Sequence, residues 1–122
     1  VPLAVSGAFH SPFMDEAAAA LAEELKSIPV QKAGIPVYSN ASAELYPEDA
    51  DAIRASIATQ VHHPVQWQAI LEKLHADGFD TFIECGAGKT LAGLVKKTLK
   101  GVSIYNVEDA DGLKAVVEAL KV

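Results

Sequence analysis

The stretch TFIECGAGKTLAGLVKKTLKGVSIYNV, residues 81–107, sets the fold class of this chain. Its pattern predicts a strand at 81–85, a tight turn at 86–88, a helix at 89–99 and a second strand at 102–107, with a further helix at 112–121. Strands that alternate with helices are typical of an architecture in which helices flank a largely parallel sheet. The sequence therefore predicts an α/β fold.

The preceding residues carry further elements, separated by prolines and turn residues. They predict, in chain order, a strand at 3–6, a helix at 12–28, a strand at 35–40, and helices at 47–61 and 65–76. In the first helix Phe13, Ala17, Leu21 and Leu25 recur four apart, so this stripe is expected to face a core. Only three to four strands result. The sheet is therefore expected to be incomplete, with one edge that takes strands from residues outside this sequence.

Composition narrows the class of protein. The 122 residues are 50% apolar, which suits one domain with a real core, and the net charge of −6 argues against binding to nucleic acid. No apolar run approaches the ~20 residues of a membrane helix, and no signal-peptide pattern opens the chain. Cys85 is the single cysteine, which excludes a disulfide framework and suits a reducing compartment such as the cytoplasm. Four residues are expected in the core: Trp67, Phe82, Tyr105 and Cys85 as an inert thiol.

The loop SGAFHSP, residues 6–12, presents a histidine between a predicted strand and a predicted helix. Open α/β sheets place their sites at such junctions, although a lone loop histidine is more often a surface residue. A histidine that activates a serine needs that serine on a sharp turn, and no Gly-x-Ser-x-Gly segment occurs in the chain. His10 is therefore a candidate base whose nucleophile is missing.

Four segments then resemble one family in order and spacing: GAFHSP at 7–12, PVYSN at 36–40, QVHHPVQW at 60–67 and ECGAGKTL at 84–91. They are similar to the motifs of malonyl-CoA:acyl carrier protein transacylases and of the acyltransferase domains in fatty acid and polyketide synthases. The resemblance implies that residues 1–122 are the C-terminal portion of an α/β-hydrolase-like acyltransferase domain. The segment with the nucleophile and the ferredoxin-like subdomain of that domain are absent from this chain.

The resemblance also implies roles for individual residues. His10 would be the general base of a ping-pong transfer of malonyl from malonyl-CoA, through a serine ester, to the phosphopantetheine thiol of acyl carrier protein. Gln60 matches the position whose main-chain carbonyl orients the histidine. Phe9 would exclude donors larger than malonyl, or would simply pack in the core. No cofactor is implied beyond these substrates, and the chain alone is expected to be inactive without the rest of the enzyme.

Other motifs have less specific interpretations. The turn at 86–88 invites a phosphate-loop interpretation, but a Walker A loop needs glycine where Ile83 stands, so its glycines are expected to allow close packing of strand on helix. His62 and His63 are expected to be structural or exposed, because two adjacent histidines make no metal site without a third ligand. Lys96 and Lys97, with Lys100 nearby, form either a solvated helix end or a docking surface for an acidic carrier protein.

Two alternatives to a discrete transacylase stay open from sequence. One is a piece of a polyketide synthase acyltransferase. The other is a non-catalytic α/β module that binds a carrier or partner protein, in which His10 is only a loop residue.

Overall fold

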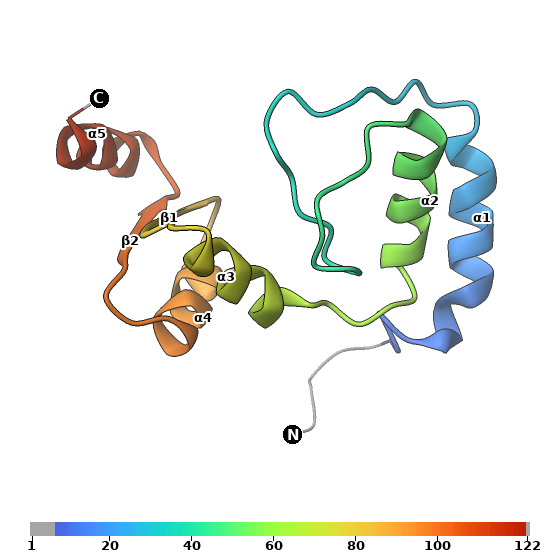
Figure 1. The fold of residues 1–122 in the computed structure, drawn as a ribbon, viewed down its shortest axis with the longest axis horizontal. Coiled ribbons are helices and arrows are strands. Elements are labelled where there is room, and N and C mark those ends of the chain that lie inside the picture. Colours follow the sequence, from blue (N-terminus) through green and yellow to red (C-terminus); the bar gives the residue numbers. More distant parts are fainter. Residues whose placement is uncertain (1–6, 122) are drawn as a thin grey trace. The chain divides into compact units, whose positions relative to one another are not determined.

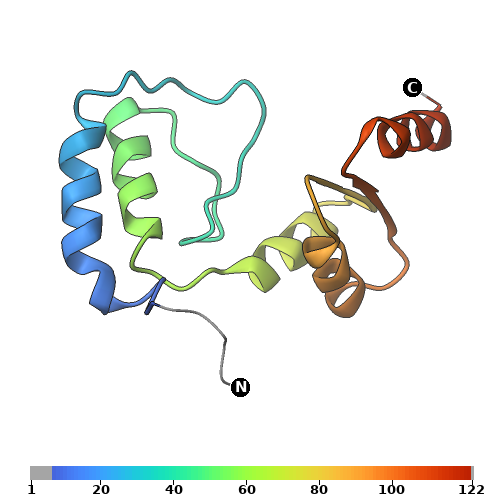
Figure 2. The ribbon, with the colours of Figure 1, turned by 180° about the vertical axis from the view of Figure 1, so that it is seen from behind.

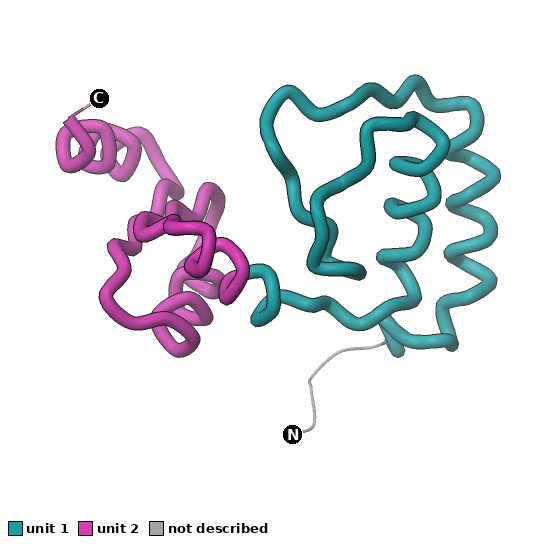
Figure 3. Tube along the Cα trace, viewed as in Figure 1, with its two compact units in different colours: residues 1–70 teal, residues 71–122 magenta. Residues whose placement is uncertain are grey.

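The computed structural model describes residues 7–121 and contains two compact units, residues 1–70 and 71–122 (Figures 1 and 3). The strand expected at 3–6 lies outside the described residues. Unit 1 holds a 3-10 turn, η1 (Pro12–Met14), followed by helices α1 (Asp15–Leu25) and α2 (Ala50–Gln60). Helix α3 (Trp67–Ala76) carries the chain from unit 1 into unit 2.

Helices α1 and α2 lie side by side and antiparallel, as both ribbon views show (Figures 1 and 2). Their buried apolar residues are Ala18 and Leu25 from α1 and Ile53 and Ala58 from α2. The predicted stripe was only partly right. Phe13 is 88% exposed because it lies in the 3-10 turn, before the α-helical phase begins. Ala17 is exposed too, because the buried face of α1 passes through the next residue.

Arg54 joins the two helices at one end of the pair. Its Nε donates to the carbonyl oxygen of Leu25 at 2.9 Å, and its Nη2 donates to that of Ile28 at 3.0 Å. The last carbonyls of a helix have no partner within the helix, so these bonds satisfy the carbonyl of the last residue of α1 and one just beyond that end. Nη1 also pairs with Asp51 at 2.7 Å.

The strand predicted at 35–40 is wrong. This segment forms only an isolated antiparallel bridge between Tyr38 and Leu45, beside bonds from the Tyr46 amide to the Val37 carbonyl and from the Ser39 amide to the Glu44 carbonyl, both 2.8 Å. A strand needs a ladder of partners on a neighbouring strand, and within the described residues this segment pairs only with its own return, apart from one bond from the Gln66 amide to the Asn40 carbonyl oxygen at 2.7 Å.

The helix predicted from residue 47 starts three residues later. The Asp49 side chain accepts a hydrogen bond from the amide of Ala52 at 2.9 Å and caps α2. A side-chain cap of this kind satisfies one of the unpaired amides of the first turn, so the helix begins directly after Asp49. Helix α3 likewise begins at Trp67, two residues after the predicted start.

Unit 2 follows the predicted order of elements. Strand β1 (Thr81–Cys85) pairs in parallel with β2 (Ser103–Val107), and helices α4 (Thr90–Thr98) and α5 (Ala110–Leu120) follow the two strands (Figure 1). Parallel strands cannot be joined by a tight turn, so the connection runs through α4. The core residues of this unit are Leu71, Val95, Leu99 and Val116. The α/β prediction is therefore confirmed.

The sheet is smaller than predicted. The described residues form two strands rather than three or four. Cys85, expected as a buried thiol, is exposed at the end of β1, because no described neighbour covers that end of the small sheet. Phe82 and Tyr105 on the two strands and Trp67 at the start of α3 are only half-buried.

Candidate active site

His10 is held by the C-terminal end of α2. Its backbone amide donates to the carbonyl oxygen of Val61 at 3.1 Å, and its ring Nδ1 lies 2.9 Å from the carbonyl oxygen of Gln60. Both carbonyls stand where a helix ends and leaves its acceptors unpaired. His10 itself has φ 58°, a left-handed conformation that is uncommon for a residue with a side chain. Two successive carbonyls thus fix both its backbone and its ring.

The contact with the Gln60 carbonyl oxygen determines which ring nitrogen of His10 carries the proton. A carbonyl oxygen only accepts hydrogen bonds, so Nδ1 carries the proton and the neutral ring has its lone pair at Nε2. The arrangement therefore suits a general base at Nε2, with a main-chain carbonyl in the orienting position that an aspartate takes in a serine protease triad.

A cavity of ≈ 330 Å³ opens beside His10. Its lining residues come from the histidine loop, η1, α1 and the end of α2: Phe9, His10, Met14, Leu21, Ile57, Gln60 and Val61. Most of these side chains are apolar, which is the usual composition of a small-molecule site. Phe9 is 61% exposed, and its ring folds back so that a Cβ at Gly7 would lie 3.1 Å from it. The bare Gly7 backbone leaves room for this position of the ring.

Two polar contacts next to the site were missed by sequence reasoning. The Tyr46 hydroxyl donates to the side-chain oxygen Oε1 of Gln60 at 3.4 Å. His62 is half-buried and places Nδ1 2.7 Å from Oδ1 of Asp15. Each contact joins residues that are far apart in sequence, so no local sequence pattern predicts it.

In unit 2, carboxylates of the protein accept hydrogen bonds from amides of the glycine turn and of the start of α4. Glu84 accepts from the amides of Leu91 at 3.1 Å and Ala92 at 2.8 Å at the start of α4. Glu108 accepts from the amide of Gly88 at 3.1 Å. Amides at a helix N-terminus are the groups that would bind a phosphate, and here the protein's own carboxylates take them. This arrangement agrees with the mismatch of the sequence to a Walker A loop.

The glycines of this turn do not allow close packing, which corrects the sequence-based interpretation. A Cβ at Gly86 or Gly88 would meet no atom of the described residues within 4 Å outside its chain neighbours. Their φ angles are +140° and +87°, in the region that residues with side chains rarely adopt. Glycine is needed here for backbone conformation.

The remaining predicted residues lie outside this cavity. Lys96 and Lys97 are exposed in the last turn of α4 in unit 2, and neither forms an ion pair within the described residues. His63 is exposed and faces the carbonyl oxygen of Thr59 with Nδ1 at 3.1 Å. Within residues 7–121, no group of three or more acidic, histidine or cysteine side chains is placed to hold a metal ion.

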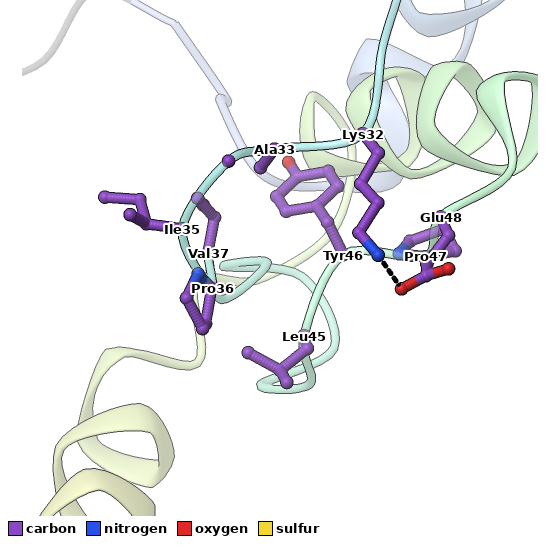
Figure 4. A pocket seen from close by; sticks show the side chains of 10 residues that line it. Lys32, Ala33, Ile35, Pro36, Val37, Leu45, Tyr46, Pro47 and Glu48 are labelled. Atoms are coloured by element: carbon purple, nitrogen blue, oxygen red, sulfur yellow. Dashed lines mark hydrogen bonds and ion pairs between the residues drawn. The ribbon is translucent and has the colours of Figure 1, made fainter.

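A second cavity of ≈ 280 Å³ lies between the segments 32–37 and 45–48 (Figure 4). The ion pair of Lys32 with Glu48 lies at one side, and apolar side chains such as Ile35 and Leu45 line the rest (Figure 4). None of the residues predicted for the site contributes to it. Among the described residues no helix has the length and apolar character to cross a membrane.

Comparison with known proteins defines the class of this chain. Residues 2–117 match the acyl transferase domain family, and the chain belongs to this family. Its relatives include the malonyl CoA-acyl carrier protein transacylase of Bacillus subtilis (strain 168), which is 40% identical over 121 residues, 99% of this chain and 38% of the relative.

Solved structures agree with this match. The malonyl CoA-acyl carrier protein transacylase from Clostridium perfringens ATCC 13124 superposes with a TM-score of 0.91 at 40% identity, over 99% of this chain and 38% of that one. A malonyl-transacylase in complex with a type II PKS acyl-carrier protein gives a TM-score of 0.91 at 32% identity, over 98% and 38%. The chain thus spans about two fifths of the length of these relatives.

Proposed function

We propose that this chain is the C-terminal portion of the α/β-hydrolase-like catalytic domain of a malonyl-CoA:acyl carrier protein transacylase, acting in the cytoplasm. The observation that carries the proposal is the 2.9 Å contact between His10 Nδ1 and the Gln60 carbonyl oxygen, beside an apolar cavity. The names of the relatives support the same reaction. The serine nucleophile belongs to another part of the enzyme, so the chain alone is inactive.

In the proposed first half-reaction, Nε2 of His10 takes the proton of the serine hydroxyl while the serine oxygen attacks the thioester carbonyl of malonyl-CoA. The tetrahedral intermediate expels the coenzyme A thiolate, which takes this proton from His10. In the second half-reaction the phosphopantetheine thiol of the carrier gives its proton to His10 and attacks the malonyl ester. The serine oxygen leaves and takes the proton back. Both thiols are substrates, and no resident cofactor is required.

A chimera tests the proposal. This chain replaces the matching segment of the Bacillus subtilis relative, and malonyl transfer from malonyl-CoA to acyl carrier protein is measured together with circular dichroism. We expect transfer by the folded chimera and none by this chain alone. A folded chimera without transfer would instead favour a non-catalytic module. A relative solved with a type II PKS acyl-carrier protein makes a polyketide carrier a second acceptor to assay.

Phe9 is proposed to limit the size of the acyl donor. Replacing Phe9 with serine in the chimera should raise the relative kcat/KM for methylmalonyl-CoA over malonyl-CoA about 10-fold or more, because one methyl group in an apolar pocket is worth roughly 1–3 kcal/mol. Competition between the two donors measures this ratio. Phe13→Ser is the matched control, since Phe13 does not line the cavity. An equal change in both variants would argue that Phe9 only packs.

Lys96 and Lys97 are proposed to attract the acidic carrier protein. Reversing both to glutamate should lower kcat/KM for acyl carrier protein about 3–10-fold at low salt, and less at high salt, because exposed charges act mainly on the association rate. Formation of the malonyl-enzyme should not change. The control reverses Lys26 and Lys114, which are exposed but paired with Glu23 and Asp111. A kcat/KM for acyl carrier protein that does not change would indicate a solvated helix end instead.

A further inference from the structure

Asp15, at the N-terminal end of α1, contacts His62, just after the C-terminal end of α2. Asp15 is the first residue of α1, five residues after His10, and His62 follows Gln60 by two residues. The Nδ1 of His62 lies 2.7 Å from Oδ1 of Asp15, with exposed fractions of 26% for the His62 side chain and 67% for that of Asp15. This pair therefore ties the segment just after His10 to the segment just after Gln60.

The segment between His10 and α1 is otherwise held mainly by the short-range backbone bonds of η1, such as that from the Met14 amide to the Ser11 carbonyl oxygen at 3.0 Å. The residue before α1, Met14, offers no side-chain cap to the helix. Ser11, which precedes η1, gives its hydroxyl to the carbonyl oxygen of Ala8 at 2.6 Å and does not cap η1. His10 is meanwhile held at φ 58°, and such backbone conformations persist only where surrounding contacts enforce them. A contact at the start of α1 adds to the two carbonyl bonds that enforce this conformation.

We infer that Asp15 and His62 are positioning residues for His10, an inference that rests on the proposed function. The Asp15 carboxylate accepts and the His62 Nδ1–H donates, so the bond forms whether His62 is neutral or charged. The rings of His62 and His63 meet edge to face, with ring centroids 4.5 Å apart, and this contact helps to orient His62. The segment 60–62 therefore contacts His10 itself through the Gln60 and Val61 carbonyls, and the start of α1 through His62.

The test uses the chimera and a matched acidic control. Asp15→Ala should lower kcat for malonyl transfer about 3–10-fold with KM for malonyl-CoA unchanged, because small displacements of a reacting group are costly. Glu16→Ala removes the same charge from the same helical turn and should leave kcat as it is.

Variants of His62 that place an amide where the imidazole was give a second comparison. His62→Asn keeps a donor near the Nδ1 position and should retain most of the rate, whereas His62→Gln moves the donor outward and should not.

A double variant separates positioning from general loss of structure. In a His10→Ala background, Asp15→Ala should cause no further decrease in the residual rate, since the positioned group is gone. A further decrease of the same size would overturn the inference, as would equal effects of Asp15→Ala and Glu16→Ala. If transfer depends on His10 but not on Asp15, the inference about Asp15 and His62 is wrong while the proposed function stands. Transfer that does not depend on His10 overturns the proposed function as well.

Discussion

Replacing His10 with alanine in the chimera is expected to lower kcat for malonyl transfer about 10²–10⁴-fold, the usual contribution of a general base. Among the described residues, the ring is the only titratable group that lines the cavity. Its Nδ1 is occupied by the Gln60 carbonyl oxygen at 2.9 Å, which directs the lone pair of Nε2 away from that carbonyl. Without the ring, a serine hydroxyl has no described acceptor for its proton in this cavity. Both malonyl-enzyme formation and carrier malonylation should slow.

The controls for this variant follow from the same geometry. His75 is an exposed histidine whose Nδ1 also faces a main-chain carbonyl oxygen, that of Phe79 at 3.4 Å, and His75→Ala should keep the full rate. Gln60→Ala should cost far less than His10→Ala, because alanine retains the carbonyl and loses only the bond to Tyr46. Equal rates for the His10 and His75 variants would remove His10 from the mechanism.

The sequence predicted unit 2 well because its signals are local. The run of β-branched and aromatic residues, ended by two glycines, predicted β1 with its observed bounds. The apolar pattern that follows predicted α4 to within one residue at each end. The start of α5 was predicted two residues late, because the Asp109 side chain caps it through the amide of Gly112 at 2.7 Å. Helix ends depend on such caps, which compete with several nearby candidates in sequence.

Non-local features were predicted less well. The segment 35–40 has the composition of a strand, but strand formation depends on partners that sequence alone does not place. The exposure of Phe13 and Cys85 has the same cause, since burial depends on which segments cover a residue. His10 and Gln60 stand 50 residues apart in sequence. Only the resemblance to a family linked them, because a contact between a side chain and a distant carbonyl leaves no pattern in the chain.

Replacing Arg54 with methionine should lower the free energy of unfolding by about 2–3 kcal/mol. Hydrogen bonds to a charged group contribute roughly 1.5–3 kcal/mol each to stability. In the variant, water binds the exposed carbonyls of Leu25 and Ile28 and recovers part of this free energy. The Arg54 side chain is only 21% exposed, so its bonds are less screened than those of a surface pair. Methionine keeps the apolar stem and its packing, so the variant isolates the guanidinium. Urea unfolding of the chimera, followed by helical circular dichroism, measures the change.

Asp51 provides the matched comparison, because it shares an ion pair with Arg54 but is itself 92% exposed. Exposed ion pairs are worth ~0–1 kcal/mol, so Asp51→Asn should have a small effect if the carbonyl contacts carry the stability. Equal losses in the two variants would show that the ion pair matters and the carbonyl contacts do not. Arg54 binds the C-terminal end of α1, whereas His10 is held at the C-terminal end of the antiparallel α2. The rate per folded molecule should therefore stay close to that of the parent chimera, which separates support of the helix pair from positioning of the base.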